Sequence, residues 1–229
     1  MRVSDIQIRS AARRAWLGTW LRHCSAACWL GAAVIAAPAA AQGPRPVLLV
    51  VGDSLSAEYG LARGSGWVAL LEARLAREKV AARVVNASIS GDTTSGGRSR
   101  LPSLLKAHRP QVVVIELGGN DALRGLPLAS TRENLAAMVR DAKGVGAKVL
   151  LVGMAVPPNY GRRYSEDFQA LFGTVARSEG AALVPFLLAG VADVPNADEL
   201  FQADRIHPKA EAHPKMLANV WPALRPLLR

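Results

Sequence analysis

From about residue 46 onward, short uninterrupted apolar runs alternate with segments in which apolar residues recur every three or four positions. The short runs are typical of parallel strands buried on both faces, and the spaced segments are typical of amphipathic helices. The runs predict five strands, at residues 46–51, 82–86, 111–117, 147–152 and 182–185. The spacing predicts five helices, at residues 67–77, around 101–108, at about 130–143, near 166–178 and at about 208–228.

Prolines refine two of these helices. Pro102 is expected near the first turn of the helix around residues 101–108, where a missing N–H group is tolerated. Pro214, Pro222 and Pro226 fall inside the last predicted helix, so we expect that helix to be broken or kinked.

The alternation of strands and helices predicts the fold class. Parallel strands joined through helices require right-handed crossovers and form an open sheet covered on both faces. The sequence has no internal repeat, no low-complexity linker and no second domain boundary, so residues 42–229 are predicted to form a single α/β domain.

The first 41 residues have a different pattern, which predicts a secretory signal peptide. An apolar run at residues 26–37 lies between a basic segment and the small residues of an Ala-x-Ala site, and we expect cleavage after Ala41. The run is shorter than the roughly 20 residues of a spanning helix, although an uncleaved membrane anchor stays open as the alternative. The predicted location is the bacterial periplasm or the exterior, with no stable membrane anchor after cleavage. Both cysteines, Cys24 and Cys28, lie in this segment.

Charge argues against one class of partner. The whole chain has a formal net charge of +10, and removal of residues 1–41 leaves 23 basic and 17 acidic residues, a net charge of +6. These charges are scattered, and the longest basic run is Arg162-Arg163. A nucleic-acid-binding surface needs a clustered basic patch, so we expect no nucleic-acid partner.

Polar motifs follow four of the five predicted strands. In such sheets, ligands bind beyond the carboxyl ends of the strands, and four motifs at one edge are hard to attribute to turns alone. They are Gly52-Asp53-Ser54-Leu55-Ser56, the segment from Asn86 to Thr93, Gly118-Gly119-Asn120-Asp121, and Asp204-Arg205-Ile206-His207-Pro208.

The residue types in these motifs are those of acyl transfer. A serine hydroxyl, here Ser54, becomes a nucleophile when an imidazole removes its proton, and His207 is the candidate base. Asp204, three residues earlier, is the candidate for orienting that imidazole. The oxyanion needs hydrogen-bond donors, and the candidates are the backbone N–H groups of Ser54 and Gly91 and the side-chain amide of Asn120.

Other polar residues have a simpler interpretation. Asp53 is expected to hold the turn by hydrogen bonds, and Asp121 is interpreted as structural. His108 is predicted at a helix C-terminus at the opposite edge of the sheet, and His213 as an exposed or packing residue of the last helix. No His, Cys or Asp cluster has metal-ligand spacing, so no metal or other cofactor is expected. Asp53 after the first strand also argues against a flavin protein, because it would repel phosphate.

The sequence resembles the SGNH (GDSL) hydrolases, and within them the secreted bacterial esterases that include acyl-CoA thioesterase I/lysophospholipase L1 and the arylesterases. The resemblance implies a flavodoxin-like three-layer α/β/α fold, no metal, and the four name-giving residues Ser54, Gly91, Asn120 and His207, with Asp204 completing a triad. The sequence departs from the family pattern at Ala122, where a relative would often have glycine, and in the residues after Pro208. We expect these departures to affect substrate preference and not the chemistry. The stretches that carry the resemblance are the Gly52–Ser56 motif, Ala57-Glu58-Tyr59-Gly60, residues 85–93, residues 116–121, Pro158-Asn159-Tyr160-Gly161, Asp204 and His207.

Two apolar, Pro- and Gly-rich segments suggest where substrate binds. They follow the third and fourth strands, and their candidate contacts are Leu123, Pro157, Asn159 and Tyr160. The expected function is hydrolysis of carboxylic esters and thioesters with short to medium acyl groups, including aryl esters. The reaction is expected to pass through an acyl-enzyme on Ser54, and the protein is expected to be a monomer. Lysophospholipids are a further candidate substrate. The alternatives are a carbohydrate acetylesterase with the same catalytic set and a non-catalytic binding module.

Overall fold

The computed structural model describes residues 45–156 and 158–229, which form one α/β unit. The predicted signal peptide, residues 1–41, lies outside these residues and stays a prediction. Five strands are present: β1 (Val47–Gly52), β2 (Arg83–Asn86), β3 (Val112–Glu116), β4 (Lys148–Val152) and β5 (Ala182–Val184). All five predicted strands are therefore confirmed, to within two residues at each end.

The strands form one parallel sheet in the order β2-β1-β3-β4-β5. This is the flavodoxin-like order, in which the strand order reverses between β1 and β3. Every residue of β1 and β3 is buried, as expected of central strands covered on both faces. The predicted five-stranded α/β/α fold is confirmed.

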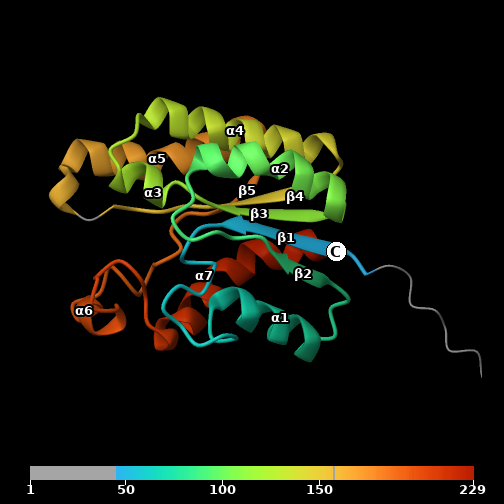
Figure 1. The fold of residues 1–229 in the computed structure, drawn as a ribbon, viewed down its shortest axis with the longest axis horizontal. Helices are drawn as coiled ribbons and strands as arrows, with labels where there is room; N and C mark the ends of the chain where they lie inside the picture. Colours follow the sequence, from blue (N-terminus) through green and yellow to red (C-terminus); the bar gives the residue numbers. More distant parts are fainter. Residues whose placement is uncertain (1–44, 157) are drawn as a thin grey trace, which may run out of the picture. The chain divides into compact units, whose positions relative to one another are not determined.

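Helices cover both faces of the sheet (Figure 1). Helices α2, α4 and α5 lie on one face, and α1 and α7 lie on the other. The helices are α1 (Trp67–Arg77), α2 (Thr94–His108), α3 (Gly119–Leu123), α4 (Leu128–Gly144), α5 (Arg162–Glu179), α6 (Ala197–Leu200) and α7 (His213–Leu224). Single 3₁₀ turns occur at Pro158–Tyr160, Ala210–Ala212 and Arg225–Leu228.

The prediction for α2 is wrong at its beginning. The helix begins at Thr94, so Pro102 lies inside it rather than in its first turn. Its first half is polar and contains Gly96 and Gly97, and therefore lacks the apolar spacing that predicts a helix. The start signal is Thr93, whose side chain accepts a hydrogen bond from the Gly96 N–H group.

Two further differences concern short elements. The Gly119–Leu123 segment, for which no helix was predicted, forms helix α3, and the short helix α6 was not predicted either. The predicted break in the last helix is present, because α7 lies between two 3₁₀ turns. Pro214 is in the first turn of α7, while Pro222 lies within it.

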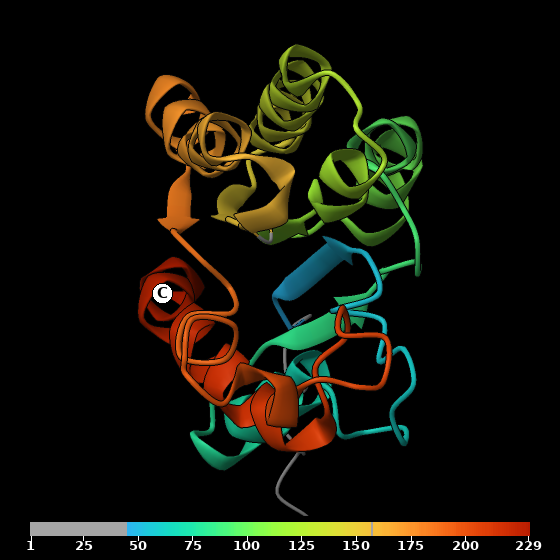
Figure 2. The ribbon, with the colours of Figure 1, turned by 90° about the vertical axis from the view of Figure 1, so that its left-hand side faces the viewer.

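None of the helices in the described part of the chain has the length and apolarity needed to cross a bilayer. Figure 2 views the sheet from the side of its carboxyl ends, where the segment between β5 and α7 lies beside the segment that follows β1. The four polar motifs all belong to segments that follow strands at this edge.

Candidate active site

Ser54 lies on a tight turn directly after β1. The Asp53 carbonyl accepts hydrogen bonds from the Ser56 and Ala57 N–H groups, at 3.2 and 2.9 Å. The Asp53 side chain accepts a further bond from the Leu55 N–H group, at 3.1 Å, which is the turn-holding role expected of it. A Cβ atom at Gly52 would lie 2.7 Å from Ser56 Oγ, so the close packing of this turn requires glycine.

Ser54, His207 and Asp204 form a continuous chain of hydrogen-bonding atoms. The Ser54 Oγ atom lies 2.9 Å from Nε2 of His207, and Nδ1 of His207 lies 2.7 Å from Oδ2 of Asp204. Ser54 and His207 are partly buried, whereas Asp204 is exposed. With a proton on Nδ1, the imidazole donates to Asp204 and leaves Nε2 free to accept from Ser54.

Asp204 is held by its own loop. Its Oδ1 atom accepts hydrogen bonds from the backbone N–H groups of Ile206 and His207, at 2.9 and 3.0 Å. The loss of part of its hydration raises the pKa of Asp204, but hydrogen bonds from the His207 backbone and ring and from the Ile206 N–H group outweigh this effect and lower the pKa to about 2. Asp204 is therefore ionised at neutral pH, as an orienting carboxylate needs to be.

Gln202 and Tyr59 join the His207 loop to the Ser54 turn. Nε2 of Gln202 donates to the backbone carbonyls of Tyr59 and Pro208, at 3.0 and 3.2 Å. The Tyr59 ring lies against the His207 imidazole, with ring centroids 4.3 Å apart and planes tilted by 37°. Gly60 adopts a φ of +71°, and a Cβ there would lie 2.1 Å from Oε1 of Gln202, so this close approach also needs glycine.

The sequence analysis names three hydrogen-bond donors for the oxyanion: the backbone N–H groups of Ser54 and Gly91 and the side-chain amide of Asn120. Within residues 45–156 and 158–229, the backbone N–H groups of Ser54 and Gly91 donate no hydrogen bond. The third donor, Nδ2 of Asn120, gives a hydrogen bond to Oδ2 of Asp53 at 3.0 Å. An amide nitrogen carries two hydrogens, so one remains available on Asn120.

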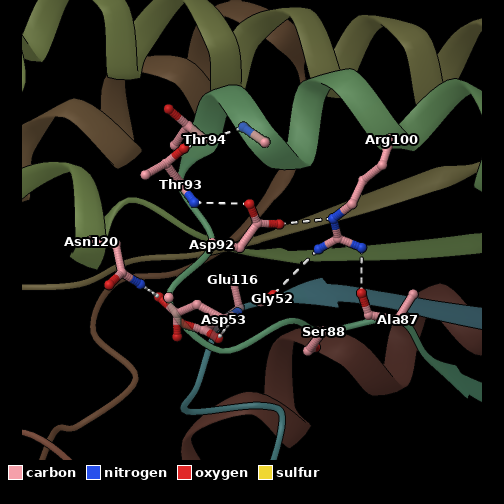
Figure 3. Close-up of polar contacts among 12 residues, drawn as sticks. Gly52, Asp53, Ala87, Ser88, Asp92, Thr93, Thr94, Arg100, Glu116 and Asn120 are labelled. Carbon is pink, nitrogen blue, oxygen red and sulfur yellow. Dashed lines mark hydrogen bonds and ion pairs between the residues drawn. The ribbon is translucent and has the colours of Figure 1, made fainter.

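Arg100 on α2 fixes the segment that carries Gly91 (Figure 3). Its guanidinium donates to the Asp92 carboxylate at 2.8 Å, to the Ala87 carbonyl, and to the Gly52 carbonyl at 3.4 Å. It therefore connects the ends of β1 and β2 to the turn after β2. Gly91 has a φ of +79°, and its carbonyl accepts a hydrogen bond from Arg124 at 2.8 Å.

Two buried acids lie under the nucleophile turn. Burial raises the pKa of Asp53 to about 6, against hydrogen bonds from the Leu55 N–H group and the Asn120 amide that lower it. Burial raises the pKa of Glu116 well above its usual range, and the nearby Asp53 carboxylate raises that pKa further. The two acids are adjacent because Gly52 and Glu116 are paired in the β1–β3 register.

The remaining sequence candidates have structural contacts. His108 is the last residue of α2, and His213 is buried, with Nδ1 accepting a hydrogen bond from the Trp67 N–H group at 3.0 Å. Burial lowers the pKa of His213. Asp121 is buried and accepts hydrogen bonds from Thr94 and Thr131, which ties α2, α3 and α4 together. These contacts fit the non-catalytic roles expected from the sequence.

The candidate substrate contacts are exposed. Leu123 ends α3, and Asn159 and Tyr160 lie in the 3₁₀ turn after β4, where the Tyr160 ring stacks on Tyr164. Within the described residues, none of these three side chains hydrogen-bonds to Ser54, Asp204 or His207. Pro157 lies outside the described residues. Their role in substrate binding stays a prediction.

Sequence reasoning missed three residues that build the site: Arg100, Glu116 and Gln202. Arg100 and Gln202 carry no local signal, because each acts on residues distant in sequence. Glu116 did leave a signal, since an acid at the end of a fully buried apolar strand needs a specific environment. Across the described residues, no three His, Cys, Asp or Glu side chains are grouped so as to hold a metal ion.

The chain is similar to several known proteins. Residues 50–214 match the model of the GDSL-like Lipase/Acylhydrolase family. The chain is 56% identical to the esterase TesA of Pseudomonas aeruginosa over 187 residues, covering 82% of this chain and 92% of the relative. It is 41% identical to thioesterase 1/protease 1/lysophospholipase L1 of Escherichia coli over 181 residues, covering 79% of this chain and 84% of the relative. A crystal structure of TesA superposes with a TM-score of 0.76 at 57% identity, covering 79% of this chain and 99% of that one.

Proposed function

The chain belongs to the GDSL-like lipase/acylhydrolase family, and we propose that it is a serine hydrolase that cleaves carboxylic esters and thioesters through an acyl-enzyme on Ser54. One observation carries the proposal. Ser54 Oγ, the His207 imidazole and the Asp204 carboxylate are connected by hydrogen-bond distances of 2.9 and 2.7 Å. This is the arrangement in which a serine hydroxyl becomes a nucleophile.

Acylation begins with attack on the substrate carbonyl carbon. Ser54 Oγ forms the new C–O bond as its proton passes to Nε2 of His207, and the carbonyl electrons move to the oxygen. Asp204 accepts the Nδ1–H hydrogen bond and stabilises the imidazolium that forms. His207 then gives its proton to the departing alcohol or thiol as the bond to the leaving group breaks.

The tetrahedral oxyanion is bound by three donors in this mechanism: the N–H groups of Ser54 and Gly91 and the free amide hydrogen of Asn120. Donors that are already fixed before the reaction lose no energy in reorienting, which is why each is worth about 3–4 kcal/mol of barrier. The hydrogen bond to Asp53 fixes the Asn120 amide, and Arg100, through Asp92, and Arg124 fix the Gly91 segment.

Deacylation repeats the same steps with water. His207 removes a proton from a water molecule that attacks the acyl-enzyme carbonyl, and the proton then returns to Ser54 Oγ as the acid product leaves. No metal or cofactor takes part in the proposed reaction. The chain's own residues supply the nucleophile, the base and the oxyanion donors.

Exposed apolar side chains support an acyl or aryl substrate. Among the described residues, seven large hydrophobic side chains are exposed, and six of them lie on segments that follow the carboxyl ends of strands. These six come from all five such segments: Tyr59, Ile89, Leu123, Leu126, Tyr160 and Ile206. They offer apolar surface to an acyl chain or ring, with Tyr59 directly beside His207.

Two measurements on the protein lacking residues 1–41 test this function. Ser54→Ala should abolish hydrolysis of p-nitrophenyl esters and labelling by a fluorophosphonate probe, while its circular dichroism stays that of the wild type. Ser95→Ala, at an exposed serine of α2, is the matched control and should keep both properties. Full activity in Ser54→Ala would overturn the assignment.

A substrate panel then defines the acyl group. Thioesters, aryl esters and lysophospholipids of increasing chain length are compared with acetylated sugars. We expect turnover of short to medium acyl chains and of aryl leaving groups. A strong preference for acetylated sugars would instead identify a carbohydrate acetylesterase.

We also propose that the protein works as a monomer in the periplasm or outside the cell. The proposed location rests on the predicted signal peptide at residues 1–41. Expression of the full chain in a bacterium, followed by cell fractionation and mass spectrometry, should find a periplasmic product that begins at Gln42. Light scattering of that product measures its oligomeric state.

A further inference from the structure

The two acids under the nucleophile turn, Asp53 and Glu116, share a dry environment. Glu116 is fully buried and Asp53 is 3% exposed. Oε2 of Glu116 accepts hydrogen bonds from the Ser56 hydroxyl at 2.7 Å and from the Asp53 backbone N–H group at 3.3 Å. In Figure 3, Asp53 lies next to Glu116, to which its backbone N–H group donates, and its side chain points toward Asn120.

Their side-chain oxygens differ in hydrogen bonding. Both oxygens of Asp53 accept a bond, one from the Leu55 N–H group and one from Asn120. The second oxygen of Glu116, Oε1, is buried and has no donor within the described part of the chain. Two adjacent buried carboxyl groups do not both ionise, because their negative charges repel each other. The negative charge is less stable on Glu116, because one of its oxygens has no hydrogen-bond donor.

Two further charged groups act on Asp53 in opposite directions: His207 lowers the pKa of Asp53, and Asp92 raises it. The Arg100 guanidinium is close by, on the Gly52 carbonyl. Burial raises the pKa of both acids, which favours a proton on the pair, and the unpartnered Oε1 atom of Glu116 points to Glu116 as the residue that holds it.

We propose that Glu116 is a positioning residue that works as an un-ionised acid: it holds the Ser54 turn through Ser56 and Asp53, and it leaves Asp53 charged to fix Asn120. The hydrogen-bond network continues to α1, because Nε1 of Trp67 donates to Ser56 Oγ at 3.2 Å. The proposal deepens the function given above and rests on it.

The consequence lies in the orientation of Asn120. If Glu116 were the charged partner, the shared proton would be on Asp53, whose oxygen would then be a weaker acceptor for the Asn120 amide. That amide would be free to rotate or to flip, and its hydrogen would no longer be aimed at the oxyanion. A neutral Glu116 is thus what keeps the donor in place.

Two substitutions at this position test the proposal kinetically. Glu116→Ala removes the contacts to Ser56 and Asp53, so kcat should fall about tenfold to a hundredfold with a smaller change in KM, since small misplacements of reacting groups have costs of this size. Glu116→Gln is neutral and keeps an oxygen acceptor, so it should restore most of the activity that Glu116→Ala loses. Glu72→Ala and Glu72→Gln, at an exposed position of α1, are matched controls.

Infrared spectroscopy measures the proton directly. An un-ionised carboxylic acid has a carbonyl stretch well separated from the carboxylate bands. At neutral pH that stretch should be present in the wild type and in Asp53→Asn and absent from Glu116→Gln, whereas a proton on Asp53 would make it disappear in Asp53→Asn as well. This measurement uses the wild type and the conservative variants, so it holds even if Glu116→Ala fails to fold.

Two results would overturn the inference: absence of the carboxylic acid band from the wild type or from Asp53→Asn, or a Glu116→Gln variant as inactive as Glu116→Ala. Failure of the proposed function looks different. In that case fluorophosphonate leaves wild-type Ser54 unlabelled and Ser54→Ala retains activity. If the wild type is active and labelled by fluorophosphonate but lacks the infrared band, only the role proposed for Glu116 is wrong.

Discussion

Asn120 donates a hydrogen bond from Nδ2 to Oδ2 of Asp53 at 3.0 Å, so the residue before the nucleophile holds the side chain proposed to bind the oxyanion. Asp53 is buried at the end of β1, and Asn120 lies in the first turn of α3, after β3. The strand-order reversal between β1 and β3 brings these two segments together. The Asp53–Asn120 hydrogen bond therefore fixes the proposed oxyanion donor relative to the turn that carries the nucleophile Ser54.

Asp53→Asn should reverse this contact. The Leu55 N–H group still needs an acceptor, so the introduced amide keeps its oxygen there and presents its NH2 group to Nδ2 of Asn120. Asn120 can then bond only if it flips, which turns its oxygen toward the oxyanion. We expect kcat to fall by about a hundredfold, close to the 10²–10³ cost of losing an oxyanion donor. Steady-state kinetics on p-nitrophenyl esters measure it, with Asp141→Asn on the exposed face of α4 as control.

A double-mutant cycle separates this mechanism from a general disturbance of the turn. Once Asn120→Ala has removed the donor, Asp53→Asn should add little further loss, because both act through the same contact. Fully additive losses would contradict the coupling.

The main elements of the site could be predicted because parallel strands end at one edge of the sheet. Ser54 and Asn120 each follow an apolar run that is easy to recognise, and Asp204 lies only three residues before His207. The sequence could not show how these segments are held against one another. Gln202 bonds to the Tyr59 carbonyl from 143 residues away, and such a contact has no local pattern. The start of α2 was missed for a related reason, since a capping Thr93 and glycines carry little apolar periodicity.

Tyr59 should keep His207 in place by ring packing. Its ring is half exposed yet lies 4.3 Å from the imidazole, centroid to centroid. Tyr59→Ala should lower kcat about two- to tenfold, the equivalent of one aromatic contact. Tyr59→Phe keeps the ring and should keep the activity, which makes it the matched control. Equal losses in the two variants would point to the hydroxyl group instead.

Gln202 should matter for rate more than for stability. Gln202→Ala removes the hydrogen bond to the Tyr59 carbonyl, which ties the His207 loop to the Ser54 turn, and a second bond, to the Pro208 carbonyl, within the loop itself, so His207 gains freedom to move away from Ser54. With a net value of about 1 kcal/mol for each bond, we expect a fall in kcat of at least about tenfold. Gln169→Ala, at an exposed position of α5, is the control. If Gln202→Ala has the kcat of the wild type, the His207 loop keeps its position without the hydrogen bond to the Tyr59 carbonyl.

The raised pKa of Asp53 predicts how the unfolding free energy depends on pH. Asp53 has a pKa of about 6 when folded and 3.8 as an unperturbed group, so between these pH values only the folded chain holds the proton. Stability falls with rising pH wherever the folded state binds more protons. Asp53 therefore contributes stability that is complete below pH 3.8 and is lost as the pH rises through about 6.

Urea unfolding of wild type and Asp53→Asn across this range measures the effect. The unfolding free energy of the wild type, relative to the variant, should fall as pH rises from about 4 to about 6.5, by up to about 3 kcal/mol for a shift of this size. Asp204→Asn is the control of opposite sign, because the pKa of Asp204 is lowered to about 2. Relative to that variant, the wild type should lose stability as the pH falls below 3.8. A pH-independent difference between wild type and Asp53→Asn would mean that Asp53 is ionised at no cost in its buried position.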